Sequence, residues 1–206
     1  MKIFVLSFLY FFACSSKSDQ QNTRLLGGPC EGCEAVLEYD DPNINAVDTL
    51  PDFDRKGPKI KLTGTVYKPG GEKPAANIIL YIHHTDQKGI YPTTGQEKGW
   101  GRRHGYLRGW VKTNEKGEYA FYTLRPAHYP NRTDPAHVHL TILESNGRYY
   151  YVEDFLFDDD PKLTNDRRTR IDPRGGKGFV LTLKKEGDLM VGKRDIILGK
   201  NIPGYE

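Results

Sequence analysis

The chain has 206 residues, with 30 Lys and Arg against 27 Asp and Glu, so its formal net charge is +3 when the histidines are neutral. A charge this small excludes the strongly basic surface of a typical nucleic-acid-binding protein. The hydrophobic share of 37% is enough for one core and too small for a membrane protein, and 22 Gly with 13 Pro favour short strands and turns over a helical bundle.

The N-terminus carries the features of an export signal. Residues 1–13 begin with Met1-Lys2 and continue with an apolar run that only Ser7 interrupts. As a helix this run spans about 16 Å, well short of a bilayer, so it predicts a signal peptide. Ala13 before Cys14 resembles a bacterial lipobox, which predicts lipidation of Cys14 and a lipoprotein at the cell envelope. Plain secretion is the alternative, and membrane contact is expected only through the lipid anchor.

Residues 14–34 are predicted to be a tether that contains the other two cysteines, Cys30 and Cys33. A C-x-x-C pair can be a redox motif, half of a zinc site or a local disulfide. Zinc needs four ligands and the sequence has no second Cys pair, while the βαβ context of thioredoxin-like motifs is missing. In an exported protein we therefore expect a structural disulfide between Cys30 and Cys33.

Residues 35–206 are predicted to form one domain, which opens with an irregular, acidic lead-in at 35–57. Beyond it, alternating or continuous apolar runs predict strands. Asn114 to Gly117 predict the turn of a hairpin between two of these runs, and Asn146-Gly147 predict a second hairpin turn. We expect an all-β fold, an antiparallel, transthyretin- or immunoglobulin-like β-sandwich with long loops. The predicted strands are 61–67, 77–82, 110–113, 118–123, 137–143, 148–157, 179–183 and 195–198.

All six histidines lie between positions 83 and 139. On a strand, His137 and His139 point to the same face with Cα atoms about 7 Å apart, which lets both bind one metal ion. That spacing also arises by chance in surface His pairs, and a Tyr beside a Pro, as at Tyr91 and Tyr129, is usually a cap on the core. The other four histidines could line a pocket, but each alone is more simply explained as a solvated loop residue. They are His83, His84, His104 and His128.

Taken together, residues from about 64 to 165 resemble the intradiol ring-cleavage dioxygenases, the catechol/protocatechuate dioxygenase-like enzymes. The resemblance rests on five segments: Gly64-Thr65-Val66, Gly89-Ile90-Tyr91, residues 111–129, Pro135-Ala136-His137-Val138-His139 and residues 157–161. It implies cleavage of an aromatic diol between its hydroxyls with O2, in the catabolism of aromatic compounds. The implied cofactor is non-haem Fe(III), a hard cation suited to phenolate and imidazole donors. Its implied ligands are Tyr91, Tyr129, His137 and His139.

The chain departs from this family where substrate would bind. Asp134 stands where catabolic members carry an Arg, and Asp154 where they often carry Gln. Arg132, or from another angle Arg125, could replace the missing guanidinium, so Tyr129 and Arg132 are the predicted catalytic residues. The expected partners are a small aromatic diol and O2, without nucleic acid, and a homo-oligomer is left open. Two alternatives remain: a secreted transthyretin-like or carboxypeptidase-regulatory-like binding module, and a metal-binding relic of the dioxygenases.

Overall fold

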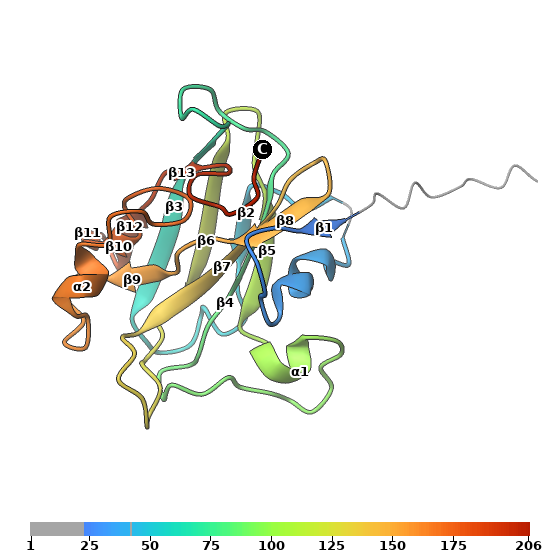
Figure 1. The fold of residues 1–206 in the computed structure, drawn as a ribbon. Coiled ribbons are helices and arrows are strands. Elements are labelled where there is room, and N and C mark those ends of the chain that lie inside the picture. The colour runs from blue at the N-terminus through green and yellow to red at the C-terminus, as the bar shows by residue number, and fades with distance from the viewer. Residues whose placement is uncertain (1–22, 42) are drawn as a thin grey trace, which may run out of the picture.

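The computed structural model describes residues 23–41 and 43–206, in which two β-sheets pack face to face (Figure 1). The first sheet has the order β1-β8-β7-β4-β5, with β9 joined to β7 and β10 to β9. Its strands are β1 (Arg24–Leu25), β4 (Ile79–His83), β5 (Arg108–Lys112), β7 (His137–Leu143), β8 (Arg148–Tyr151), β9 (Phe155–Phe157) and β10 (Val180–Leu181). The predicted β-sandwich is confirmed.

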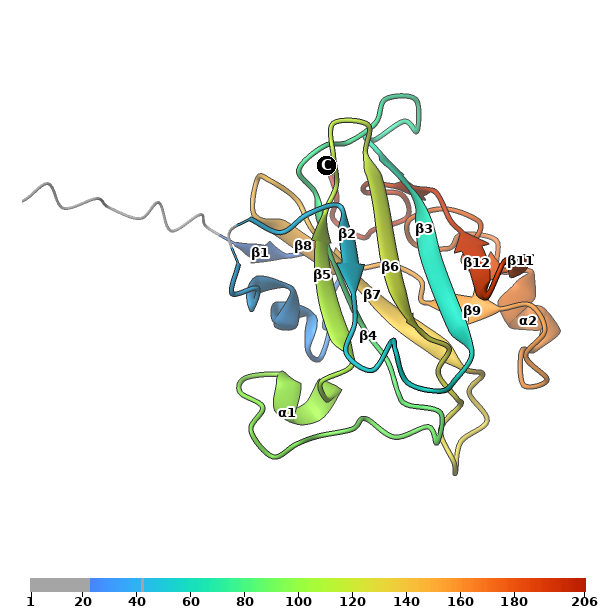
Figure 2. The same cartoon turned by 180° about the vertical axis from the view of Figure 1, so that it is seen from behind.

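The second sheet has the order β11-β12-β3-β6-β2, with β13 joined to β3, and lies in front in Figure 2. Its strands are β2 (Val47–Thr49), β3 (Lys59–Tyr67), β6 (Glu118–Leu124), β11 (Lys184–Glu186), β12 (Leu189–Lys193) and β13 (Ile196–Ile197). The central pairs are antiparallel, as predicted. The sheets as a whole are mixed, because segments near both chain ends add parallel partners such as β1 on β8 and β12 on β3.

Strand alternation explains where the core lies. Along β3 every second residue is buried, and the even-numbered residues of β7, such as Val138 and Leu140, join the core between the sheets. Successive side chains of a strand point to opposite faces, so His137 and His139 point to the outer face of the first sheet. The 3-10 helix η1 (Cys33–Leu37) covers part of that face and packs against Tyr81.

The predicted hairpin around Asn114–Gly117 is wrong in one respect. The turn forms, since the Gly117 N–H donates to the Asn114 carbonyl at 2.9 Å. The strands on either side do not pair, because β5 belongs to the first sheet and β6 to the second. The turn therefore carries the chain from one layer of the sandwich to the other. The Asn146-Gly147 turn, by contrast, does join an antiparallel pair, β7 and β8.

Two further segments differ from expectation. The predicted strand 148–157 is interrupted, because residues 152–154 lie between β8 and β9 without strand pairing. The predicted tether 14–34 includes chain that packs into the domain, since β1 pairs with β8 and Leu26 is buried in the core. The predicted signal peptide 1–13 and lipidation at Cys14 lie outside the described residues and stay predictions. None of the helices in the described part of the chain has the length and apolar character needed to cross a membrane.

Candidate metal centre

His137 and His139 converge at one end of β7. Their Nε2 atoms are 3.2 Å apart. Nδ1 of His137 donates to the Pro135 carbonyl at 2.7 Å, and Nδ1 of His139 donates to the Asp154 carboxylate at 3.2 Å. Because both Nδ1 atoms carry the proton in these bonds, both Nε2 lone pairs are free to face a common point.

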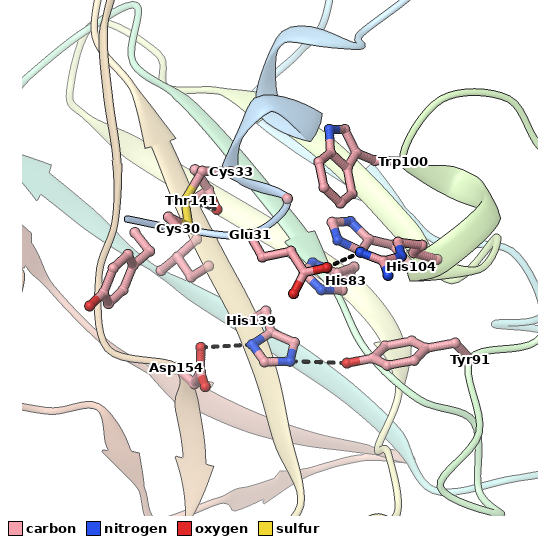
Figure 3. Close-up of a pocket in the computed structure, with 14 residues that line it drawn as sticks. Cys30, Glu31, Cys33, His83, Tyr91, Trp100, His104, His139, Thr141 and Asp154 are labelled. Atoms are coloured by element: carbon pink, nitrogen blue, oxygen red, sulfur yellow. Dashed lines mark hydrogen bonds and ion pairs between the residues drawn. A yellow bond between two sulfur atoms is a disulfide. The ribbon is translucent and has the colours of Figure 1, made fainter. Parts of the chain in front are cut away.

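The two tyrosines reach the same point from loops. The Tyr91 and Tyr129 hydroxyl oxygens are 2.6 Å apart. Nε2 of His139 lies 3.0 Å from the Tyr91 oxygen and 3.4 Å from the Tyr129 oxygen. Two imidazole nitrogens and two phenol oxygens thus form one compact group, of which Figure 3 shows Tyr91 and His139.

Close contact between two loops brings the tyrosines together. Gly89 has φ +77°, and a Cβ on it would lie 2.0 Å from the His128 carbonyl oxygen, so only glycine fits there. The Thr85 hydroxyl donates to the Ala127 carbonyl at 2.7 Å and ties the same loops a second time. The loop after β4 is therefore held against the loop after β6, and each contributes one tyrosine.

Burial keeps the tyrosines protonated when no cation is present. It raises the pKa of the Tyr91 phenol far above its ordinary value, and the hydrogen bond to Tyr129 adds to this. Burial also raises the pKa of Tyr129. A trivalent cation between the two oxygens would offset this cost and stabilise both phenolates. Two hard oxygen donors with two imidazoles fit an iron ion well.

Asp154 contacts the donor group through His139. Ligand atoms of His137, His139 and Asp154 lie within 4.8 Å of one another. The Asp154 carboxylate, however, faces Nδ1 of His139, on the side of the ring away from Tyr91. Burial raises the pKa of this carboxyl, but the charge and hydrogen bond of His139 outweigh burial and leave the pKa below its ordinary value. We infer that Asp154 orients the imidazole rather than binding the metal.

The structure assigns different partners to the arginines considered from sequence. The Arg132 guanidinium lies 5.4 Å from the centre of the Tyr129 ring, on an exposed loop. Arg125 forms two hydrogen bonds with Asp159, at 2.6 and 2.8 Å, and is not available to the site. Asp134 pairs with Arg167 at 2.7 Å, so the negative charge it introduces has a cationic partner.

Three of the remaining histidines are not solvated loop residues, contrary to expectation. His84 and His104 are buried, and Nδ1 of His83 is buried without a hydrogen-bond partner. The His83 ring stacks on the His104 ring at 3.7 Å and on the His139 ring at 4.5 Å between centroids. Burial lowers the pKa of all three, so they are neutral at physiological pH. Nothing in the local sequence pattern distinguishes such a stack from separate loop histidines.

His84 makes the stability of the metal-free protein depend on pH. Burial lowers its folded-state pKa to about 4, whereas an unfolded His titrates near 6.5. The unfolded chain therefore binds an extra proton between these values, and the free energy of unfolding is expected to fall by up to about 3 kcal/mol as the pH drops from about 6.5 to 4. Urea unfolding against pH measures this, and His84→Gln should reduce the slope by about one proton. An unchanged slope would contradict the assignment.

Comparisons with protein families and with curated proteins both identify dioxygenases as relatives of this chain. The family described as Dioxygenase matches residues 39–186. Catechol 1,2-dioxygenase 1 of Acinetobacter lwoffii is 30% identical over 162 residues, which cover 69% of this chain and 48% of that protein. The chain thus spans about half the length of this curated relative.

Solved structures share the fold at lower identity. The dioxygenase domain of a dioxygenase–carbohydrate-binding protein fusion from Streptomyces sp. SirexAA-E has a TM-score of 0.58 and 20% identity, covering 82% of this chain and 95% of that chain. The intradiol ring-cleavage dioxygenase from Tetranychus urticae has a TM-score of 0.55 and 24% identity, covering 82% and 90%. At these identities the likeness establishes the fold alone.

Proposed function

The chain belongs to the intradiol ring-cleavage dioxygenases, and from this premise we propose that it opens the ring of a catechol-type diol between its two hydroxyls with O2. The proposed cofactor is a non-haem Fe(III) held by Tyr91, Tyr129, His137 and His139. The observation that carries the proposal is the convergence of these four donor atoms, with successive separations of 2.6 to 3.4 Å. A spacer or binding module of the sandwich type needs no such group.

A ferric ion held by these four residues would supply Lewis acidity that activates the diol ring toward O2. The protein's own residues accept a proton from the diol and orient the metal-binding imidazoles. Tyr129 would accept a proton from the diol, because burial raises the pKa of its free phenol and so favours the protonated side chain. Asp154 and the Pro135 carbonyl accept hydrogen bonds from the two Nδ1 atoms and so orient both imidazoles with Nε2 toward the donor group. The carbon–carbon bond between the two hydroxyl-bearing carbons breaks, and one oxygen atom of O2 enters each of the two carboxyl groups of the product. The diol supplies all the electrons that O2 takes up.

Colour tests the cofactor directly. The purified protein, reconstituted with iron in air, is expected to be burgundy through charge transfer from phenolate to Fe(III). Tyr129→Phe removes one phenolate, so the visible band should shift and catechol turnover should slow by at least about 100-fold. Absorption spectra and oxygen uptake measure the two effects.

Tyr106→Phe is the matched control, because the Tyr106 hydroxyl bonds to Asp52 away from the donor group. It should leave the spectrum unchanged. A colourless protein after reconstitution would overturn the iron assignment. A burgundy protein that turns over no catechol would instead favour the metal-binding relic.

A further inference from the structure

A cavity of about 460 Å³ opens beside the metal centre, lined in part by Tyr91, His139 and Asp154 (Figure 3). A cavity of roughly 150 Å³ is enough to hold one benzene ring. The space is therefore much larger than a bare catechol ring requires. Binding of the metal by four side chains does not explain the rest of its lining.

One wall of the cavity is a stack of rings that ends at the metal centre. Trp100 stacks on His104 at 5.5 Å between centroids, His104 on His83 at 3.7 Å, and His83 on His139 at 4.5 Å. The Tyr81 hydroxyl is 2.7 Å from Nδ1 of His104 and fixes the middle of the stack. This wall extends away from the donor group over four stacked rings, which leaves room along it for an organic group larger than one ring.

A second part of the lining is the loop closed by the Cys30–Cys33 disulfide. Gly32 in this loop has φ +86°, and a Cβ on it would lie 2.4 Å from Nε2 of His104. Glu31 forms an ion pair with Arg103, which lies in α1 (Gly101–His104). The loop is thus fixed close to the ring stack on one side and to α1 on the other.

The charges of the cavity are unequal. Its lining contains two carboxylates, Glu31 and Asp154, and one guanidinium, Arg103. Glu31 and Arg103 pair with each other, so the remaining charge of the lining is the Asp154 carboxylate, which is hydrogen-bonded to Nδ1 of His139. Trp100 also lines the cavity, and aromatic faces attract cations. The Tyr151 ring, also in the lining, already has the Arg174 guanidinium 4.0 Å from its centre. An anionic group would be repelled here, and a neutral or cationic one would not.

We propose that this cavity is the subsite for the substituent of a ring-substituted catechol, and that it accepts a neutral or cationic substituent and disfavours an anionic one. The inference rests on the proposed function, because the diol end of such a substrate must reach the iron. Specificity then depends on the disulfide loop and on Trp100, His104 and His83 of the ring stack, none of which is a proposed metal ligand.

Substrates with side chains of similar length test the charge preference. We would compare ethylcatechol, aminoethylcatechol and carboxyethylcatechol with catechol itself, by kcat/KM and by equilibrium dialysis against metal-free protein. The carboxyethyl compound is expected to be at least about fivefold poorer than the other two by both measures.

Substitutions in the cavity lining test which residues produce the preference for neutral or cationic substituents. Trp100→Ala should lower the ratio of kcat/KM for ethylcatechol to kcat/KM for catechol about fivefold. Glu31→Gln should reduce the preference for aminoethylcatechol over carboxyethylcatechol, and Arg103→Gln should increase it. Arg102→Gln and Glu34→Gln are matched controls. They make the same charge changes at neighbouring positions that do not line the cavity, and they should alter no ratio.

The outcomes separate the two proposals. A protein that cleaves catechol while none of the cavity variants alters a ratio would overturn the subsite and leave the proposed function standing. A protein that cleaves no catechol and takes up no iron would overturn the proposed function. Dialysis then still decides the subsite, because equal affinities for all three side chains, unchanged by Trp100→Ala, would exclude it.

Discussion

Replacing His139 with alanine is expected to lower the affinity for iron by more than about 100-fold and to abolish both colour and turnover. The expectation follows from its central place in the donor group, since its Nε2 lies within 3.4 Å of the other three donor atoms. Loss of a residue that only orients a ligand typically costs 10–100-fold, so loss of the ligand itself should cost more. Iron content after dialysis against a competing chelator measures the effect.

Asp154→Asn provides a graded comparison for His139→Ala. Asparagine keeps the size of the side chain and an acceptor oxygen but removes the charge that polarises His139, so the loss of iron affinity should be about 10–100-fold. His128→Gln is the control, because its Nδ1 contacts Lys162 and the Tyr129 carbonyl rather than the donor group. If His139→Ala retained iron as well as His128→Gln does, His139 would not be a ligand.

The convergence of His137 and His139 can be expected from the sequence because its physical basis is local. Alternation along 137–143 places His137 and His139 on one face whatever the rest of the fold does. Tyr91 and Tyr129 carry no such local signal, and only their place in the resemblance to the dioxygenases connects them. The structure supplies the reason they meet, which is the contact between Gly89 and the His128 carbonyl.

The role of Asp154 is less predictable. The apolar pattern of 148–157 predicts one continuous strand, in which Asp154 would be an ordinary alternating residue. The chain instead leaves the strand at Val152 and joins β9 at Phe155, and this break turns the carboxylate toward Nδ1 of His139. β8 and β9 both pair with β7, with three residues of this segment opposite two of β7, so the break is a bulge that a pattern of period two does not locate.

The same limit explains the error at Asn114–Gly117. Turn residues predict that the chain reverses, and it does, but they do not determine which sheet receives the next strand. The histidines are a second case. His84 is buried because its Nδ1 donates to the Thr85 carbonyl and its Nε2 accepts from the Thr123 hydroxyl, and Thr123 lies in the other sheet. Only the assembled sandwich provides those partners.

Gly64 lies where β3 packs against Arg194, a residue whose side chain bonds to the loop that carries Asp154. A Cβ on this residue of β3 would lie 1.7 Å from the carbonyl oxygen of Arg194 and 2.6 Å from its carbonyl carbon. Arg194 is fully buried, and its guanidinium donates to the carbonyls of Glu153 and Arg174. The peptide that follows the Glu153 carbonyl carries Asp154. Close approach of β3 to Arg194 therefore supports the loop that orients His139.

Gly64→Ala is expected to destabilise the metal-free protein by about 3 kcal/mol or more, since the clash is with backbone that is itself hydrogen-bonded. The Arg194 N–H donates to the Thr63 carbonyl at 2.9 Å and its carbonyl accepts from the Tyr119 hydroxyl at 2.8 Å, so neither can move freely. Gly57→Ala is the matched control, because its Cβ would meet only a Leu124 methyl at 3.0 Å and should cost less than about 1 kcal/mol. Urea unfolding measures both variants, and iron titration of whatever Gly64→Ala protein folds should show weakened binding. Equal losses of stability in the two variants would mean that the approach of β3 to Arg194 does not require glycine.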